Sequence, residues 1–208
     1  MKIVDCSRDM SGAIGDAVAA VKRGELVVLP TDTVYGVGAD AFSPAAVDKL
    51  LSAKGRGRDK PSPVLVACAA DAERLTTEVP AVARALMDEF WPGALTIILP
   101  ANEDIGWDLG ETGGTVALRM PDNPIALALL SAAGPMAVSS ANLTAHHPAA
   151  TASQACEQLG DKVAVYLDGG ECGGGEPSTI VIVGDELRIV RHGAIPDSEI
   201  ARFGTIAQ

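Results

Sequence analysis

Apolar and polar positions alternate along the chain with two different periods, and this pattern predicts the secondary structure. Over residues 11–23 the apolar side chains recur at helical spacing, and Gly24 ends the segment. The other predicted helices cover residues 44–53, 80–90, 124–133 and 151–159, with a short helix after Pro196. Short apolar runs bounded by proline, glycine or polar residues predict strands over residues 25–30, 63–67, 94–100, 115–120, 135–139, 162–167, 178–183 and 186–190.

The order of these elements predicts an α/β fold. Strands and helices alternate over most of the chain, which is typical of a sheet covered by helices. The last two strands are joined through Gly184 and Asp185, which favours an antiparallel hairpin and therefore a mixed sheet. The chain shows no repeat, linker or shift in composition. We therefore expect residues 1–208 to form a single domain.

Charge and aromatic content argue against a general nucleic-acid or membrane binder. The net charge is −11, and only 3% of the residues are aromatic. An acidic surface repels polyanions and anionic lipids, and stacking on RNA bases requires aromatic side chains.

Cysteine usage and hydropathy favour a cytoplasmic protein. The four cysteines form no CxxC pair, and the N-terminal residues have no apolar core of a signal peptide. Residues 123–156 contain no charged side chain, but Gly134 and Pro135 interrupt the apolar run. A membrane span needs roughly 20 apolar residues in succession, so we expect none here.

One short segment concentrates positive charge in this acidic chain. The segment AKGRGRDKP, residues 53–61, carries cations at every second position, namely Lys54, Arg56, Arg58 and Lys60. A solvated turn is one interpretation. An extended backbone would instead project all four side chains the same way, along one side of a cavity. Four like charges so close together favour an anion partner, and a polyphosphate suits the donors of Arg and Lys.

Polar residues also follow or precede the predicted strands. They are Thr31, Thr33, Arg119, Ser140, Asn142, Ser178 and Arg191. In open α/β sheets the strand ends deliver loops into a ligand-binding crevice, so these residues predict one polar crevice. Taken singly, each has a structural alternative: the hydroxyl residues suit turns, and Arg119 could pair with Asp122.

Other candidate features carry weaker signals. Adjacent histidines, His146 and His147, point apart in an extended loop, so we do not expect a metal there. His192 is expected at the surface beside a turn. Cys172 lies in the glycine-rich loop 169–177, which we expect to be flexible because it lacks the GK[ST] of a phosphate-binding loop. Nothing near Cys172 would lower the pKa of its thiol.

Seven motifs occur in an order that resembles the YrdC-like family. They are LPTDTVYGVG, KGRGRDKP, WPGALTIIL, VALRMP, SSAN, PSTIV and the turn Arg191-His192-Gly193. The resemblance covers residues 10–195, about nine-tenths of the chain, and is strongest to bacterial threonylcarbamoyl-AMP synthases of the TsaC type. It implies a twisted open sheet with a deep concave site. Some longer relatives carry an extra C-terminal domain, and because this chain ends soon after Arg191, we expect no additional C-terminal domain here. The resemblance also implies synthesis of threonylcarbamoyl-AMP and pyrophosphate from L-threonine, bicarbonate and ATP, for modification of tRNA by downstream threonylcarbamoyl-transferase proteins.

The resemblance also assigns residue roles. The KxR and SxN motifs of the family's active site match Lys54, Arg56, Ser140 and Asn142. The family's ATP contacts match Arg56, Lys60, Thr115, Ser140 and Arg191, and its threonine contacts match Thr33, Arg119 and Ser178. Mg²⁺ is expected to arrive with the nucleotide. Three positions depart from the family pattern: Ala145 replaces a glycine, Ile182 an acidic residue and Asn123 a histidine. If that glycine has a positive φ, Ala145 is strained.

Two other functions compete with an adenylate-forming synthase. One is an RNA-binding module, and the other is a nucleotide-binding paralogue with little synthase activity. The acidic charge and scarce aromatic residues favour the enzyme over the RNA module, and we expect weak or no direct binding of free tRNA. Only an activity assay distinguishes the adenylate-forming synthase from the paralogue with little synthase activity.

Overall fold

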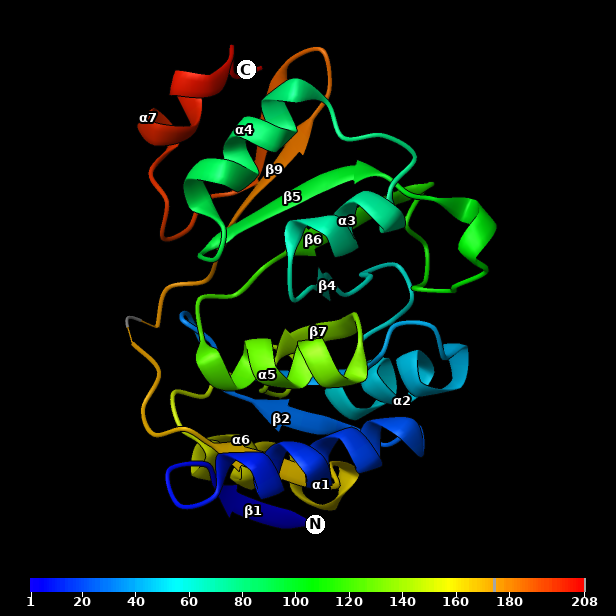
Figure 1. Cartoon of the computed structure of the whole chain (residues 1–208), viewed down its shortest axis with the longest axis vertical. Coiled ribbons are helices and arrows are strands. Elements are labelled where there is room, and N and C mark those ends of the chain that lie inside the picture. The colour runs from blue at the N-terminus through cyan, green and yellow to red at the C-terminus, as the bar shows by residue number, and fades with distance from the viewer. Residues whose placement is uncertain (174, 208) are drawn as a thin grey trace.

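A computed structural model describes residues 1–173 and 175–207, and its ten strands form one mixed sheet. The strands are stacked along the long axis of the molecule, with β1 at the N-terminal end and the hairpin with β9 near the C-terminal end (Figure 1). Their order is β1-β8-β2-β3-β7-β4-β6-β5-β9-β10. Their bounds are β1 Lys2–Asp5, β2 Val27–Leu29, β3 Gly36–Asp40, β4 Val64–Leu65, β5 Leu95–Pro100, β6 Thr115–Arg119, β7 Met136–Ser140, β8 Val165–Asp168, β9 Thr179–Val183 and β10 Leu187–Arg191.

Helices cover both faces of the sheet. Their bounds are α1 Met10–Lys22, α2 Pro44–Lys54, α3 Ala69–Leu75, α4 Ala81–Phe90, α5 Pro124–Ala133, α6 Ala152–Leu159 and α7 Asp197–Ile200. Three short 3₁₀ turns lie at Glu103–Ile105, Gly160–Lys162 and Ala201–Phe203. None of the helices in the described part of the chain has both the length and the apolar character to cross a bilayer.

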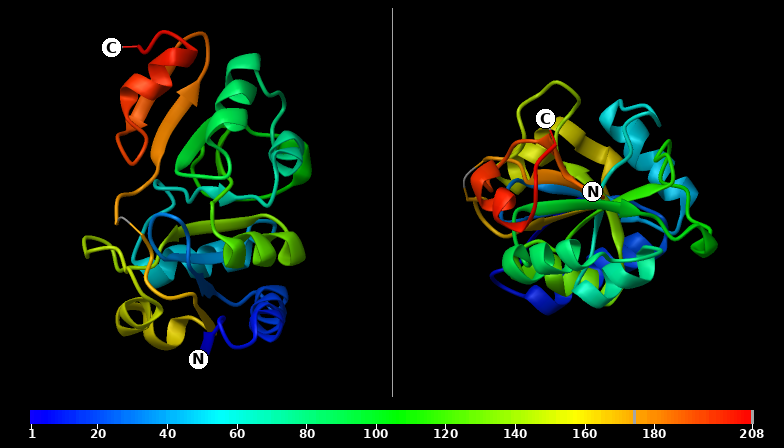
Figure 2. Two further views of the ribbon diagram at one scale, coloured as in Figure 1. Left: turned by 60° about the vertical axis from the view of Figure 1, so that its left-hand side comes forward. Right: turned by 90° about the horizontal axis from the view of Figure 1, so that it is seen from above.

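The fully buried strand β2 shows how the sequence specifies this layering. Val27 and Leu29 pack with α1 and α5, whereas Val28 packs with α2 and α6 on the opposite face. Figure 2 shows α1 and α5 together on one side of the sheet and α6 on the other. A strand covered on both faces reads as a continuous apolar run, which is why VVL shows no alternation.

The predicted hairpin is confirmed, and so is the mixed character of the sheet. β9 and β10 are antiparallel, whereas β5 and β9 are parallel. The two-residue strand β4 connects the two halves of the sheet, because it pairs with β7 on one side and β6 on the other.

Three elements were not predicted, namely β1, β3 and α3. β1 is an edge strand whose side chains are mostly exposed, and α3 is short and has no side-chain cap. β3 contains Gly36 and Gly38, which weaken a strand pattern. The glycines are required by packing: a Cβ on Gly36 would lie 2.6 Å from Cγ1 of Val138 in the neighbouring strand β7.

Candidate active site

The strand ends meet at a cavity of about 290 Å³, which we call the central hollow. Its polar lining comprises Thr31, Thr33, Arg56, Thr96, Arg119, Ser139, Ser140, Ser178 and Arg191. These residues come from the ends of β2, β6, β7, β9 and β10, from β5 and from the loop after α2. The polar crevice predicted from the strand ends is therefore present.

A second cavity of about 220 Å³, which we call the side hollow, adjoins the first. The two share Arg56, Pro63 and Arg191, so these side chains form the boundary between them. The remaining lining of the side hollow is Pro61, Ser62, Ile98, Leu109, Thr112, Thr115, Val116, Ala117 and Ile180. No carboxylate lines either hollow among the residues that the structure describes.

Arg119, at the end of β6, is held by residues from two other segments. Nη2 donates to Oδ1 of Asp32 at 2.7 Å, Nη1 donates to Oγ1 of Thr33 at 3.0 Å, and Nε donates to the Gly93 carbonyl at 3.0 Å. The alternative pairing with Asp122 is wrong, because the guanidinium pairs with Asp32, whose Oδ1 also accepts from the backbone N–H of Asp122. A guanidinium has five N–H donors, so two of them remain for a ligand carboxylate.

Ser178 and Arg191 form a second fixed unit in the lining of the central hollow. Arg191 donates from Nη2 to Oγ of Ser178 at 2.8 Å and from Nε to the Ser178 carbonyl at 2.9 Å. Thr96, on β5, lies 2.8 Å from the same Ser178 hydroxyl. These contacts fix the orientation of the Ser178 hydroxyl at the edge of the central hollow.

Three guanidinium groups therefore converge on one space. Burial lowers the pKa of Arg56 and of Arg119. The pKa of Arg191 is lowered mainly by burial, and further by the positive charges of Arg119 and Arg56. Arginine stays charged despite such shifts, so the three guanidinium groups repel one another. In addition, Nε of Arg56 is buried without a hydrogen-bond partner among the described residues. An anion bound between these side chains would relieve both penalties.

Lys54 has a different position from the one predicted. It is the last residue of α2 rather than part of an extended loop, and its side chain is only 1% exposed. Nζ donates to the Ser140 carbonyl and, at 2.7 Å, to the Asn142 carbonyl. The Lys54 carbonyl accepts in turn from the Thr144 hydroxyl at 2.8 Å. Lys54 thus fixes the Ser140–Asn142 turn and lies behind the wall of the central hollow.

The other two cations of the segment lie outside both hollows. Arg58 is paired at the surface with Asp108 and, at 2.6 Å, with Asp48, while Lys60 is exposed. The prediction that all four cations line one side of a cavity is therefore wrong, because the segment turns at Gly55 with a φ of 62° instead of remaining extended. Only Arg56 of the four lines the two hollows.

The environment of Lys54 predicts a pH dependence of stability. Burial, followed by the charge of Arg56, lowers the pKa of Lys54 from 10.5 to about 8. An unfolded chain keeps this proton up to pH 10.5, so between pH 8 and 10.5 the folded state binds fewer protons. The free energy of unfolding of the wild type, relative to Lys54→Met, should therefore rise over this interval by up to about 3 kcal/mol. Urea unfolding at several pH values tests this, and parallel pH profiles of the two proteins would contradict it.

Comparison with known proteins identifies the family. The Sua5/YciO/YrdC family model, described as "Telomere recombination", matches residues 19–193. A relative from Mycobacterium tuberculosis is 51% identical over 200 residues, which are 95% of this chain and 92% of that one. The chain belongs to the Sua5/YciO/YrdC family. The resemblance seen in the sequence motifs is thereby confirmed.

Two members of the Sua5/YciO/YrdC family have informative names. The Bacillus subtilis protein named threonylcarbamoyl-AMP synthase is 41% identical over 90% of this chain, which spans 55% of that longer protein. The crystal structure of Pyrococcus abyssi Sua5 complexed with L-threonine superposes with a TM-score of 0.88 at 33% identity, covering 100% of this chain and 63% of that one.

The departures from the Sua5/YciO/YrdC motifs have local explanations at two of three positions. Asn123 is the N-cap of α5, where its Oδ1 accepts from the N–H groups of Ile125 and Ala126 at 3.0 and 3.1 Å. Ile182 is half-buried in β9, opposite Ile98 and Arg188, where an apolar side chain packs. Ala145 has a φ of 67°, so the expected strain is present.

Relief of this strain is a testable prediction. A positive φ costs a residue with a Cβ roughly 1–2 kcal/mol, whereas glycine adopts it freely. We expect Ala145→Gly to raise the free energy of unfolding by about 1 kcal/mol, measured by urea denaturation. The matched control is Ala150→Gly, because the φ of Ala150 is not positive, and this variant should be destabilised instead. Equal destabilisation of both variants would contradict the assignment of strain to Ala145.

The remaining candidates lie away from the central hollow. Thr115 lines the side hollow, and its hydroxyl donates to the Thr112 carbonyl at 2.8 Å. His146 and His147 are exposed, and His192 is exposed beside Asp197, as expected for His192. In the glycine-rich loop 169–177, Cys172 is buried, and burial raises the pKa of its thiol. Gly174 of that loop lies outside the described residues.

Three residues of the site were missed by the sequence analysis. Asp32 orients Arg119, Thr96 orients Ser178, and the Tyr35 hydroxyl donates to the Gly170 carbonyl at 2.6 Å, which attaches the glycine-rich loop to the site. Asp32 and Tyr35 belong to the same TDTVYG segment as Thr33. The sequence did contain a signal for Asp32, because its carboxylate is next to hydroxyl residues that were predicted to bind the ligand.

Proposed function

We propose that this protein is an L-threonylcarbamoyladenylate synthase, a nucleotidyltransferase that forms threonylcarbamoyl-AMP and pyrophosphate from L-threonine, bicarbonate or CO₂, and ATP. The observation that carries the proposal is the convergence of Arg56, Arg119 and Arg191 on the central hollow. Neither this hollow nor the adjoining side hollow has a lining carboxylate among the described residues. Such a space suits a ligand with several negative charges. The names of the family members quoted above support the choice of reaction.

In this proposal the amino acid occupies the central hollow. The two remaining donors of Arg119 bind the threonine carboxylate as a fork, and the hydroxyls of Thr33 and Ser178 line the same hollow. Both hydroxyls are already fixed by hydrogen bonds, so threonine binds without much loss of side-chain freedom.

ATP occupies the side hollow and the boundary between the side hollow and the central hollow. Arg56 and Arg191 bind its phosphates, the Ser140 hydroxyl lies at the reacting phosphate, and Thr115 contacts the nucleoside. Lys54 holds the Ser140–Asn142 turn in place, and exposed Lys60 contributes from the rim.

The reaction proceeds in two steps. The threonine amine adds to CO₂, forming a C–N bond and losing a proton to solvent, which gives a carbamate. A carbamate oxygen then attacks the α-phosphorus of ATP, and the bond from this phosphorus to the bridging oxygen breaks to release pyrophosphate. Negative charge increases on the phosphoryl oxygens, where Arg56 and Arg191 stabilise it.

The residues of the site fit a metal that travels with the nucleotide. Among the described residues no group of three or more His, Cys, Asp or Glu side chains gathers at metal-binding distance. Mg²⁺ is commonly held by substrate phosphates with few protein ligands, and it neutralises charge on the leaving pyrophosphate. We propose that it binds here through the phosphate oxygens. The product would pass to downstream threonylcarbamoyl-transferase proteins, with little direct binding of tRNA by this acidic chain.

Selectivity for the threonine hydroxyl tests the proposed pocket. A site whose buried groups hydrogen-bond a substrate hydroxyl rejects an analogue that lacks it, because its own polar groups are left unpaired. We expect kcat/KM for L-threonine to exceed that for 2-aminobutyrate by about a hundredfold or more, with serine between them. The rate of pyrophosphate release measures turnover with each of the three amino acids. Equal turnover of the three amino acids would show that Thr33 and Ser178 do not recognise the hydroxyl.

A further inference from the structure

Ser62 carries a buried hydroxyl that has no role in the proposed function so far. It directly follows the KGRGRDKP motif, and none of the roles assigned from the sequence motifs falls on it. The residue lines the side hollow but not the central hollow, and it is only 4% exposed. Its Oγ has no hydrogen-bond partner among the described residues. A buried hydroxyl without a partner lowers stability, so its position in the lining of a cavity points to a ligand.

Buried polar atoms without a partner are concentrated at this hollow. Among the described residues three buried side-chain atoms lack one, namely Nε of Arg56, Oγ of Ser62 and Oδ1 of Asn142. Arg56 and Ser62 both line the side hollow, whereas Asn142 does not. The Arg56 Nε can only donate, and a serine hydroxyl can donate as well, so one group with several acceptor oxygens would suit both. A phosphate group is such a ligand.

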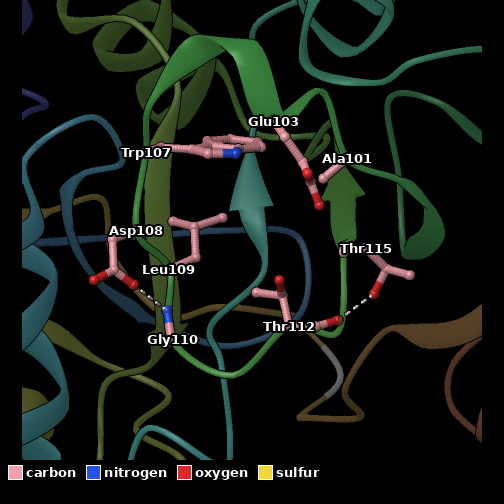
Figure 3. A pocket seen from close by; sticks show the side chains of 9 residues that line it. Ala101, Glu103, Trp107, Asp108, Leu109, Gly110, Thr112 and Thr115 are labelled. Carbon is pink, nitrogen blue, oxygen red and sulfur yellow. Dashed lines mark hydrogen bonds between the residues drawn. The ribbon is translucent and has the colours of Figure 1, made fainter.

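The other polar residues of the side hollow are already bound elsewhere. The Thr115 hydroxyl donates to the Thr112 carbonyl at 2.8 Å, a contact drawn in Figure 3. Arg191 donates from Nε and Nη2 to the carbonyl and the hydroxyl of Ser178. Apart from Thr112, the rest of the lining is apolar: Pro61, Pro63, Ile98, Leu109, Val116, Ala117 and Ile180. A partner for Ser62 is therefore supplied by the ligand that occupies the hollow.

The backbone around Ser62 is held in place. Pro61 and Pro63 flank it, each with a φ fixed by its ring, and the second proline also restricts Ser62 to extended conformations. The Pro63 carbonyl accepts from the N–H of Val138 at 2.8 Å, which attaches this segment to β7. A serine side chain has few rotamers, so turning its hydroxyl toward a ligand costs little conformational entropy.

The direction of the proposed reaction selects the phosphate group that reaches Ser62. The attacking carbamate oxygen comes from the central hollow, and Arg56 and Arg191 form the boundary with the side hollow. In phosphoryl transfer the attacking and leaving oxygens lie roughly in line, on opposite sides of the phosphorus. With the α-phosphorus at this boundary, the bond to the leaving pyrophosphate therefore points into the side hollow, which Ser62 lines.

We infer that Ser62 is a further catalytic residue, which donates a hydrogen bond to the pyrophosphate leaving group together with Nε of Arg56. The inference rests on the proposed function, because it takes the α-phosphate to lie between Arg56 and Arg191. When the bond from the α-phosphorus to the bridging oxygen breaks, its electron pair stays on pyrophosphate, whose negative charge increases. A hydroxyl that donates to these oxygens stabilises that charge in the transition state.

Binding of inorganic pyrophosphate tests this contact directly. In calorimetry, Ser62→Ala should bind pyrophosphate about tenfold more weakly than the wild type and AMP with unchanged affinity, because AMP lacks the leaving group. The matched control is Ser52→Ala, which changes an exposed serine of α2 that lines neither hollow and should bind both ligands like the wild type. Weaker binding of AMP with unchanged binding of pyrophosphate would overturn the inference, because Ser62 would then contact the nucleoside end.

Stability and rate together distinguish this role from a structural one. Ser62→Ala removes a buried hydroxyl that has no partner among the described residues, so the urea midpoint should stay the same or rise. In contrast, kcat for synthesis should fall about tenfold, with KM for threonine unchanged. Ser62→Cys has nearly the same volume and a weaker donor, so its kcat should lie between those of Ser62→Ala and the wild type. A lower urea midpoint with unchanged pyrophosphate affinity would assign Ser62 to the fold and overturn the inference.

Failure of this inference differs from failure of the proposed function. If the wild type makes the adenylate, and Ser62→Ala keeps both its affinity for pyrophosphate and its kcat, only the role of Ser62 is overturned. If calorimetry shows that the wild type binds neither ATP nor pyrophosphate, both the inference and the proposed function are overturned.

Discussion

Replacement of Arg56 by alanine is expected to lower synthesis of threonylcarbamoyl-AMP by about a hundredfold or more, with little change in stability. Arg56 lines both hollows, and its Nε has no partner among the described residues. We therefore expect Arg56 to stabilise a bound ligand and not the folded state. Loss of a charged contact to the transition state costs on the order of 3 kcal/mol. Pyrophosphate release gives the rate, and urea denaturation gives the stability.

Arg58→Ala is the matched control for Arg56→Ala. Arg58 is two residues away and carries the same charge, but its guanidinium is exposed and bound to Asp48 and Asp108. We expect this variant to lose less than about fivefold in rate, since surface ion pairs contribute about 1 kcal/mol or less. A folded Arg56→Ala protein with near-normal synthesis would refute the role of Arg56, and equal losses in both variants would show that only the local charge matters.

The second large effect is expected at Arg119. Arg119→Met removes the guanidinium that binds the threonine carboxylate, so KM for threonine should rise about thirtyfold, corresponding to about 2 kcal/mol. The same change leaves the carboxylate of Asp32 without its 2.7 Å partner in a place where its side chain is only 17% exposed. Stability should fall by about 3 kcal/mol, because a partly buried charge is left unpaired.

A double variant separates these two effects. Asp32→Asn combined with Arg119→Met removes the unpaired charge, and the side-chain oxygen of Asn can still accept from the N–H of Asp122. We expect most of the lost stability to return while KM for threonine stays high. Recovery of threonine binding in the double variant would show that Arg119 acts only by neutralising Asp32.

The position of polar residues at strand ends predicted most of the residues that gather at the site, although Asn142, chosen in the same way, lines neither hollow. Thr33, Ser140, Ser178 and Arg191 were chosen because they begin or end strands, and all four line the central hollow. This worked because the order of strands and helices is encoded in local periodicity, and strand ends of an α/β sheet meet at a common crevice.

The orientation of individual side chains could not be predicted in the same way. Lys54 turns toward carbonyls 86 and 88 residues away, and Arg119 pairs with Asp32 from a segment 87 residues away. These partners are set by tertiary contacts, which no local pattern contains. Strand β3 was missed for the same reason, since the need for Gly36 appears only when Val138 packs against it.

The most direct test of the proposed synthase is to incubate the purified protein with ATP, L-threonine and bicarbonate, and to measure pyrophosphate and the adenylate product together. Omission of L-threonine is the control, because hydrolysis of ATP alone does not need the amino acid. The account predicts equal amounts of pyrophosphate and threonylcarbamoyl-AMP, both dependent on L-threonine and both lost in Arg56→Ala. Binding of ATP and threonine without formation of either product would contradict the proposed synthase and leave a nucleotide-binding protein of the same fold.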